Sequence, residues 1–283
     1  MIKENTVAEI LKWIELHLEE RISIKDIVNF SGFSRRHIYT IFKDYTGLPI
    51  GKYIRQRKLC RAAYKLKLTS LSVAQIACSL EFDSQQSFSR EFKKLFGITP
   101  KAYRCTEAWD MTHLQIPIRV ESDELPEIEL CNIPEQKYYG YEIIYHQTYD
   151  DALNGKDDSF RWGILQKNMN KVRQDVFLIS KFSPSKELPE EIEVNTFVGI
   201  IDKKGKANYM TKERQEPKGL YVHYTYTGKW GDYVKLSRKV YREVLPKMNL
   251  KRRNGEDIER IRYLRSNTER RLVTCDCYIP VSY

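Results

Sequence analysis

The stretch EFDSQQSFSREFKKLFGITPKAYR, residues 81–104, decides how the first part of the chain folds. Phe88, Phe92 and Phe96 recur at every fourth position, as on one face of an α-helix. Gly97 and Pro100 then end the pattern. Three phenylalanines on one stripe must dock on the rest of their own unit, so the residues between them face outward. These outward positions are Gln85, Gln86, Ser87, Arg90 and Lys93.

The same pattern occurs fifty residues earlier, in GFSRRHIYTIFKDYTGLPI, residues 32–50. A shift of fifty places Ser34 on Ser84 and Phe42 on Phe92. Internal similarity of this kind is typical of one supersecondary unit used twice. Each copy is expected to be a helix, a tight turn and a second helix. The serines expected to cap these helices are Ser23 and Ser34 in the first copy, and Ser72 and Ser84 in the second.

The outward faces of the two second helices carry side chains of the types that suit the base edges and phosphates of duplex DNA. Arginine can donate to O6 and N7 of guanine, and glutamine can pair with N6 and N7 of adenine. Lysines further along a helix, and the helix N-terminus itself, meet phosphates. The outward residues of the first copy are Arg35, Arg36, Tyr39, Thr40 and Lys43. The alternative is a surface helix with ordinary polar residues, but the presence of two copies favours a pair of recognition helices.

Between the copies, residues 48–70 read as one long helix that opens at Ile50. Such a stiff rod would present both recognition helices to one face of DNA, roughly 34 Å apart. A preceding helix, residues 6–20, is expected to pack the first copy. Cations of the rod expected on its solvated faces are Arg55, Arg57, Lys58, Arg61, Lys65 and Lys67.

The charge of the chain is concentrated in its first third. The net charge is +10, and residues 1–105 hold 19 Lys and Arg against 10 Asp and Glu, while the remainder holds 29 against 28. Such asymmetry favours a polyanion-binding domain joined to a nearly neutral one over a merely basic surface. With 41% apolar and 12% aromatic residues the chain is expected to fold rather than be disordered.

Composition also limits the other function classes. No apolar run reaches the roughly 18–20 residues that a membrane span requires, and the N-terminus shows no secretory signal, so a cytoplasmic protein is expected. The six cysteines have irregular spacings and are expected to be reduced thiols. Cys275 and Cys277 alternate as on a strand, and no second pair completes a zinc set, so neither a metal nor a cofactor is expected.

The paired units ending in SFSREFKKLFGITPKAYR resemble the DNA-binding domain of AraC/XylS transcription regulators, over roughly residues 5–105. The segment FDSQQSFSREFKK is especially similar to the subgroup that contains MarA, SoxS and Rob. A DNA-binding domain at the N-terminus followed by a second domain is a Rob-like arrangement. The resemblance implies a monomeric activator that grips two successive major-groove segments of double-stranded DNA and recruits RNA polymerase. It also implies DNA contacts from Gln85, Gln86, Ser87 and Arg90.

The first recognition helix, here called the first reader, departs from that subgroup, and the second recognition helix is called the second reader. Where those relatives carry a tryptophan and a base-reading arginine, this chain has Arg36 and Thr40, and Tyr39 replaces a glutamine. Arg35 and Arg36 could supply phosphate or guanine contacts instead. The half-site read by this helix is therefore expected to differ or to be weakly specified.

Beyond residue 105 the pattern changes to alternating strands. Residues 106–135 are expected to form a linker and a first strand, and residues 136–283 a second domain. Two helices, expected at 160–174 and 231–248, interleave with the strands, which indicates an antiparallel α+β domain. This order is similar to the GyrI-like effector-binding domain. Strands are expected within 138–149, 176–182, 196–202, 219–228 and 272–281.

An excess of aromatic residues in this domain favours a pocket for a small hydrophobic or amphipathic molecule, since 14 of the 19 tyrosines lie beyond residue 105. The alternative for most of them is core packing. The resemblance implies that an inward glutamate, here Glu259, receives a cationic ligand; alternatively, Arg260 or Arg262 already pairs with it. The expected pocket residues are Glu259, Trp162, Trp230, Tyr141 and Tyr224.

Two alternatives to a sequence-specific regulator stay open. One is an architectural DNA binder with little sequence preference. The other is an enzyme that uses the second domain for hydrolysis, or a repair protein with a methyl-accepting cysteine. Against an enzyme, the five histidines form no set with a nucleophile, and Cys105 and Cys131 lack the companion metal ligands that a methyl acceptor uses.

Overall fold

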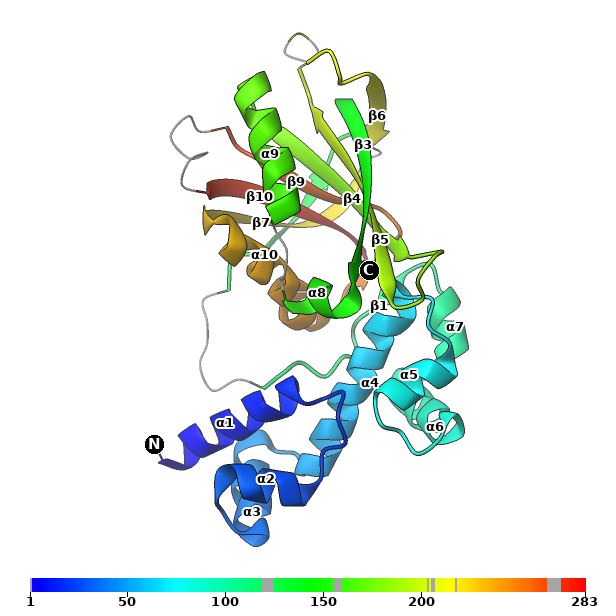
Figure 1. Ribbon diagram of the computed structural model, residues 1–283, viewed down its shortest axis with the longest axis vertical. Helices are drawn as coiled ribbons and strands as arrows, with labels where there is room; N and C mark the ends of the chain where they lie inside the picture. The colour runs from blue at the N-terminus through cyan, green and yellow to red at the C-terminus, as the bar shows by residue number, and fades with distance from the viewer. Residues whose placement is uncertain are drawn as a thin grey trace. The chain divides into compact units, whose positions relative to one another are not determined.

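The computed structural model describes residues 2–118, 125–154, 159–202, 204, 207–216, 218–263 and 271–283. The chain divides into two compact units (Figure 1). The helical unit comprises residues 1–67, 71–106 and 113–124, and the sheet unit comprises residues 68–70, 107–112 and 125–283. A helical domain followed by an α+β domain with an antiparallel sheet confirms the predicted fold class.

The helical unit contains two helix-turn-helix pairs on either side of a long helix. All four predicted serine caps are confirmed: each side chain accepts a hydrogen bond from the backbone N–H three residues on. Gly47 and Gly97 end the two second helices in the left-handed conformation, with φ near 72° and 77°. The helices are α1 (Ile2–Leu16), α2 (Ile24–Ser31), α3 (Arg35–Thr46), α4 (Ile50–Leu68), α5 (Val73–Ser79), α6 (Gln85–Phe96) and α7 (Pro100–Cys105).

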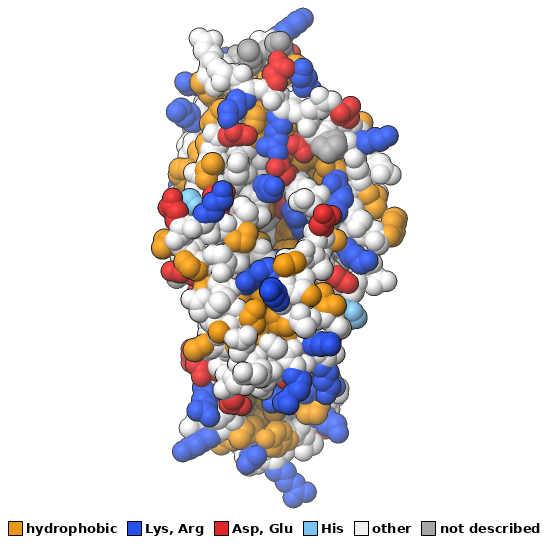
Figure 2. Space-filling model, turned by 90° about the vertical axis from the view of Figure 1, so that its right-hand side faces the viewer, with side chains coloured by type: hydrophobic (Ala, Val, Ile, Leu, Met, Phe, Trp, Pro, Cys, Tyr) orange, Lys and Arg blue, Asp and Glu red, His pale blue; other side chains and the backbone are white. Residues whose placement is uncertain are grey.

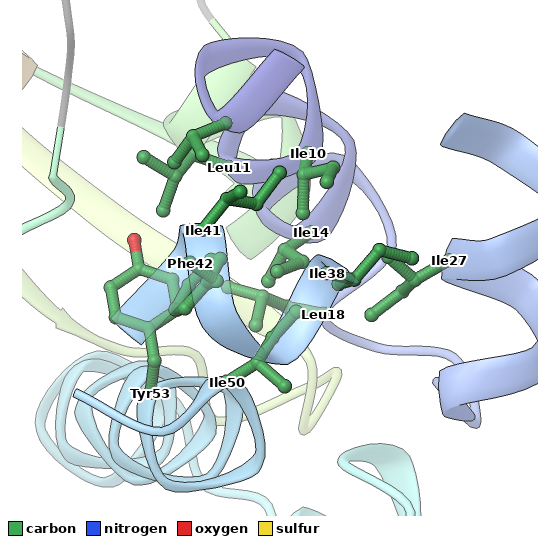
Figure 3. Close-up of a cluster of buried hydrophobic side chains, with 11 residues drawn as sticks. Ile10, Leu11, Ile14, Leu18, Ile27, Ile38, Ile41, Phe42, Ile50 and Tyr53 are labelled. Carbon is green, nitrogen blue, oxygen red and sulfur yellow. The ribbon is translucent and has the colours of Figure 1, made fainter. Parts of the chain in front are cut away.

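Each helix-turn-helix pair has its own apolar core. In the first, Ile14 of α1 and Ile38 and Phe42 of α3 point toward one another beside Tyr53 of α4 (Figure 3). In the second, the phenylalanine stripe of α6 is fully buried, and its last two rings pack on Tyr103 of α7. The stripes therefore anchor α3 and α6 and leave their opposite faces exposed.

The prediction that the cations of α4 lie on wet faces is wrong for three of them. Arg57, Lys58 and Lys65 are only 6%, 8% and 5% exposed. Arg57 is held by both carboxylate oxygens of Glu15, at 2.7 and 2.9 Å, and Lys65 donates to Glu19 at 2.9 Å. Helix α1 and the turn after it supply these two carboxylates. Cations that look solvated in the sequence are therefore buried as their partners.

Lys58 connects the two helix-turn-helix pairs. Its ammonium donates to the carbonyl oxygens of Glu20, after α1, and of Leu80, at the end of α5, both at 2.9 Å. Burial lowers the pKa of Lys58, although the charges of Glu81 and Glu19 oppose that change. One side chain of α4 thus binds the turn that leads into the first helix-turn-helix pair and the end of the first helix of the second pair.

Part of the segment 106–135, predicted as a linker, is packed rather than free. β1 (Trp109–Asp110) pairs with β8 (Lys251–Arg252) in the sheet unit. The backbone N–H of Gln115 then contacts Sγ of Cys60 in the helical unit at 3.0 Å, and its carbonyl accepts from Arg57. The segment therefore has anchored stretches in both units, because buried donors and acceptors of α4 need partners that its neighbouring helices do not supply.

The sheet unit is built on antiparallel strands in the order β2-β7-β10-β9-β4-β5-β3-β6. β8 extends the sheet at the end of β10. The predicted strands are present, together with short ones whose alternation was too brief to recognise. The main bounds are β2 (Glu129–Ile133), β3 (Gln136–Thr148), β4 (Val176–Pro184), β5 (Glu191–Ile200), β6 (Lys212–Glu216), β7 (Gly219–Lys229), β9 (Asp257–Ile261) and β10 (Leu272–Ser282).

The sheet consists of two similar halves. In each half a strand, a helix and two more strands follow one another: β3-α9-β4-β5, and then β7-α10-β9-β10. The strands are ordered β4-β5-β3 in one half and β9-β10-β7 in the other, so the pairing of β4 with β9 joins the halves about a local two-fold relation. Helices α9 (Ser159–Val172) and α10 (Trp230–Lys239) lie against the same face of the sheet (Figure 1).

The second of these helices is shorter than predicted. The expected helix 231–248 is α-helical only to Lys239, and a π-turn at Val240–Val244 and a 3₁₀ turn at Leu245–Met248 follow. Pro246 lacks the N–H that would continue an α-helical ladder, which accounts for the change. A short helix, α8 (Tyr149–Asn154), follows β3.

Replacing Lys58 by methionine should lower the free energy of unfolding of the helical unit by about 1–3 kcal/mol, because the carbonyls of Glu20 and of the buried Leu80 lose their donor. Urea unfolding followed by circular dichroism measures the change. Lys52→Met, at an exposed position of the same helix, is the matched control. Equal stability of the two variants would contradict a structural role for the Lys58 bridge.

Candidate nucleic-acid interface and effector site

The first recognition helix is α3, and the structure places all five of its predicted contact residues on the exposed face. Arg35, Arg36, Tyr39 and Thr40 line a shallow open hollow there. Arg35 lies 5.5 Å from the centroid of the Tyr39 ring, and the Thr40 hydroxyl donates to the carbonyl of Arg36 at 3.1 Å. Arg35 and Thr40 are therefore partly engaged within the helix, whereas Arg36 and Lys43 project from it.

The second recognition helix is α6, which begins at Gln85 after the cap Ser84. Gln85, Gln86, Arg90 and Lys93 are exposed, and Ser87 is half-buried because its N–H bonds back to Ser84 at 3.1 Å. The amides occupy the first turn and the cations lie further along. This order matches base edges near the helix N-terminus and phosphates beyond them.

The surface of the helical unit carries exposed positive charges that would attract a polyanion. In the lower part of Figure 2, which this unit occupies, Lys and Arg side chains stand out from the surface. Arg55 of α4 is exposed and lies 3.7 Å from Glu91 of α6, so it is tied to the second reader. Repetition of the recognition helix did not reveal Arg55, which the long-helix pattern placed only on a wet face.

In the sheet unit, four of the five predicted effector residues lie close to one another. Trp230, at the start of α10, is fully buried and its ring centroid is 6.0 Å from that of Trp162 on α9. Tyr224 and Glu259 are buried on the sheet face below these helices. One row of cross-strand partners defines that face: Tyr141, Val198, Leu178, Glu259, Cys277 and Tyr224.

Tyr141 lies at the far end of this row from Tyr224. Three strand spacings, or roughly 14 Å, separate it from Glu259. Its hydroxyl accepts from Asn168 of α9 at 2.8 Å, and its ring packs on Tyr209. Tyr141 therefore belongs to a separate polar contact of α9 rather than to the surroundings of Glu259.

The prediction that Arg260 or Arg262 pairs with Glu259 is wrong. Successive side chains of a strand point to opposite faces, so both arginines lie on the other face, where Arg260 pairs with Asp175 and Arg262 with Asp276. The cation beside Glu259 is Arg161, in the first turn of α9. No signal in the sequence joins two residues 98 positions apart.

Tyrosines complete the environment of Glu259. Tyr233 of α10 donates its hydroxyl to Oε1 of Glu259. Burial, together with the charges of nearby groups, raises the pKa of Tyr224 and of Tyr233 well above its ordinary value. Both phenols therefore stay protonated, and act as neutral hydrogen-bond groups rather than as acids.

In the part of the chain that the structure describes, no three His, Cys, Asp or Glu side chains gather in a way that could hold a metal ion. No helix among the described residues has the length and apolar character needed to cross a membrane.

Two family models match the chain. A helix-turn-helix domain matches residues 27–105, and a GyrI-like small molecule binding domain matches residues 126–282. The second match covers more than half of the chain, and the boundary between the two falls within the segment 106–135.

Similar curated proteins cover between 78% and 99% of the chain. The HTH-type transcriptional regulator YkgA of Escherichia coli (strain K12) is 38% identical over 78% of this chain and 91% of its own length. The F1 operon positive regulatory protein of Yersinia pestis is 33% identical over 99% and 89%. The right origin-binding protein of Escherichia coli (strain K12) is 30% identical over 92% and 91%.

Removing the side chain of Arg90 tests whether it reads bases. Arg90→Ala should cost about 1–3 kcal/mol on the preferred duplex and relax selection at one or two base pairs. Lys93→Ala is the matched comparison, because an exposed lysine one turn on should weaken binding uniformly and reduce the salt slope by about one. Fluorescence anisotropy on preferred and scrambled duplexes separates the two. A uniform loss for Arg90→Ala would assign Arg90 to phosphate.

Thr40→Arg tests the first reader. Thr40 is exposed, but its hydroxyl already donates a hydrogen bond to the carbonyl of Arg36. An arginine at this position should therefore strengthen binding to half-sites preferred by the MarA-like subgroup. Competition between such a half-site and a random duplex measures the change. An equal gain on both duplexes would reflect added phosphate attraction only, and no gain would show that α3 is not engaged as predicted.

Proposed function

Because this chain belongs to the AraC/XylS family of DNA-binding transcription regulators and carries a GyrI-like small molecule binding domain, we propose that it binds two successive major-groove segments as a monomer. Helices α3 and α6 enter the grooves, and the complex activates transcription through contact with RNA polymerase. A small amphipathic molecule bound by the sheet unit modulates this activity.

The observation that carries the proposal is the pair of outward recognition faces on one rod. Helix α4 has 19 residues and is therefore roughly 28 Å long. This length approaches the roughly 34 Å of one turn of B-DNA. Lys58 bonds to the turn that leads into the first copy of the repeat and to the end of α5 in the second copy, which supports a fixed spacing of the two readers.

The two readers differ in what they can specify. Helix α6 offers two exposed amides and Arg90, so it carries most of the base recognition. Helix α3 has Arg35 against Tyr39 and Thr40 turned to its own backbone. We therefore assign to α3 a guanine or phosphate contact from Arg36 and a looser half-site.

The effector proposal rests on a buried carboxylate among aromatic rings. A buried Glu259 is costly unless it is paired, and its neighbours Trp230 and Tyr224 are amphipathic and rigid. Such surroundings suit an aromatic molecule with one charged group. A bound effector changes DNA binding or activation only if it favours one arrangement of the two units over another.

A regulator is favoured over an enzyme. The F1 operon positive regulatory protein and YkgA are named as regulators, and the third relative is named for its binding to a DNA origin. A methyl-accepting cysteine needs a reactive thiolate, whereas partial burial raises the pKa of Cys131, one of the two cysteines considered for that role. Selection of bound fragments from random duplex DNA distinguishes a regulator from an architectural binder: a shared two-part motif is expected, and recovery of unrelated sequences would contradict sequence-specific recognition.

The full chain should bind its selected DNA with steep salt dependence. Six to ten phosphate contacts would lower affinity by about 10³ to 10⁵ between 50 and 200 mM salt. Titrations at several salt concentrations give the slope of log affinity against log salt. A slope shallower than about −3 would mean too few phosphate contacts for two grooves.

A further inference from the structure

The carboxylate at the centre of the proposed effector site already has a full set of partners. Glu259 is 8% exposed. Arg161 donates to its Oε2 and Tyr233 donates to its Oε1. Because a buried carboxylate is stable only when its charge and lone pairs are satisfied, these two contacts explain how Glu259 is tolerated without any bound molecule.

Arg161 makes the contacts that a flat organic cation would make. Its guanidinium forms an ion pair with Glu259 and lies 5.3 Å from the centroid of the Trp230 ring. The combination of a carboxylate and an indole face is the one that selects cations with aromatic surface. A planar guanidinium therefore fills this position from within the chain.

The arginine is also placed where it can leave. Its side chain is 21% exposed, against 10% for that of Glu259. Arg161 lies in the first turn of α9, whose last turns are held separately by the contact of Asn168 with Tyr141 and Tyr209. A swing of this side chain into water needs no change in the rest of the helix.

The local two-fold relation shows that the charged site is specific to one half of the sheet. Leu178 of β4 is the cross-strand partner of Glu259 of β9 and occupies the equivalent position in the other half. Leucine needs no partner, so the pair of Glu259 and Arg161 is an addition to the common framework rather than part of what holds both halves.

We propose that Arg161 is a built-in competitor for the effector: its guanidinium occupies the position of an effector's cationic group and must be displaced for a planar aromatic cation to bind. This inference rests on the proposed effector site of the sheet unit. The competition weakens the apparent affinity for cations and makes the site discriminate against those that cannot replace both the ion pair and the stacking contact.

Two dyes of the same shape test the proposal on the full chain. N-methylacridinium is a planar cation, and acridine is its uncharged analogue at a pH where the ring nitrogen is not protonated. Fluorescence titration of Arg161→Met should show roughly ten- to a hundred-fold tighter binding of N-methylacridinium, the usual scale of coupling between two competing interactions, with little change for acridine. Glu259→Gln should lose the preference for the cation, and adding Arg161→Met to it should then have no effect.

Arg260→Met is the matched control, because it removes an arginine from an ion pair on the opposite face of the same strand. Its affinity for both dyes should equal that of the unmodified chain. If Arg161→Met folds poorly, Arg161→Lys keeps a cation beside Glu259 and should give an intermediate gain. Thermal stability lost in Arg161→Met should also be restored by methylguanidinium, and not by urea at the same concentration.

Unchanged or weaker binding of N-methylacridinium by Arg161→Met, while acridine still binds, would overturn the competitor role and leave the effector site standing. Binding of neither dye by any variant would contradict the effector site itself. The two failures are therefore distinguishable.

Discussion

The arrangement of the helical unit depends on polar groups buried along α4. An apolar rod could pack its neighbours in several registers, because hydrophobic contact has no direction. The ion pair of Arg57 with Glu15 and the two carbonyl bonds of Lys58 are directional, and each is costly to leave unmade. They fix α1 and the end of α5 at set positions along one helix. The spacing of α3 and α6, on which reading two grooves depends, follows from these bonds together with the apolar stripes.

In the sheet unit, directional polar bonds also satisfy a buried charge, here that of Glu259. Two similar halves meet where β4 pairs with β9, and the common framework is apolar. On it one half carries a buried carboxylate, which the face-covering helices α9 and α10 satisfy through Arg161 and Tyr233. A site whose charge is balanced by a movable side chain can be stable when empty and still accept a ligand. A fully apolar equivalent, as at Leu178, would offer no such selectivity.

The connection between the units is more constrained than a run of polar residues and prolines indicates. β1 pairs with β8 in the sheet unit, and Gln115 satisfies groups of α4 in the helical unit. Only two residues lie between Thr112, the last residue of the first anchored stretch, and Gln115. Irregular sequence without periodicity gives no sign of such anchoring, since the donors and acceptors involved belong to distant helices.

The two predicted recognition helices, their serine caps and the residues on their outer faces could be read from the sequence alone, because helical periodicity and capping act over three or four residues. Strand alternation likewise set the face of Glu259, and could have excluded Arg260 and Arg262 as its partners. Only the tertiary structure decided which charges are buried. Arg57, Lys58 and Arg161 have the same local pattern as solvated cations, and differ from them through carboxylates and carbonyls that lie 22 to 98 residues away in the chain. Burial and pairing are long-range properties, and local composition does not encode them.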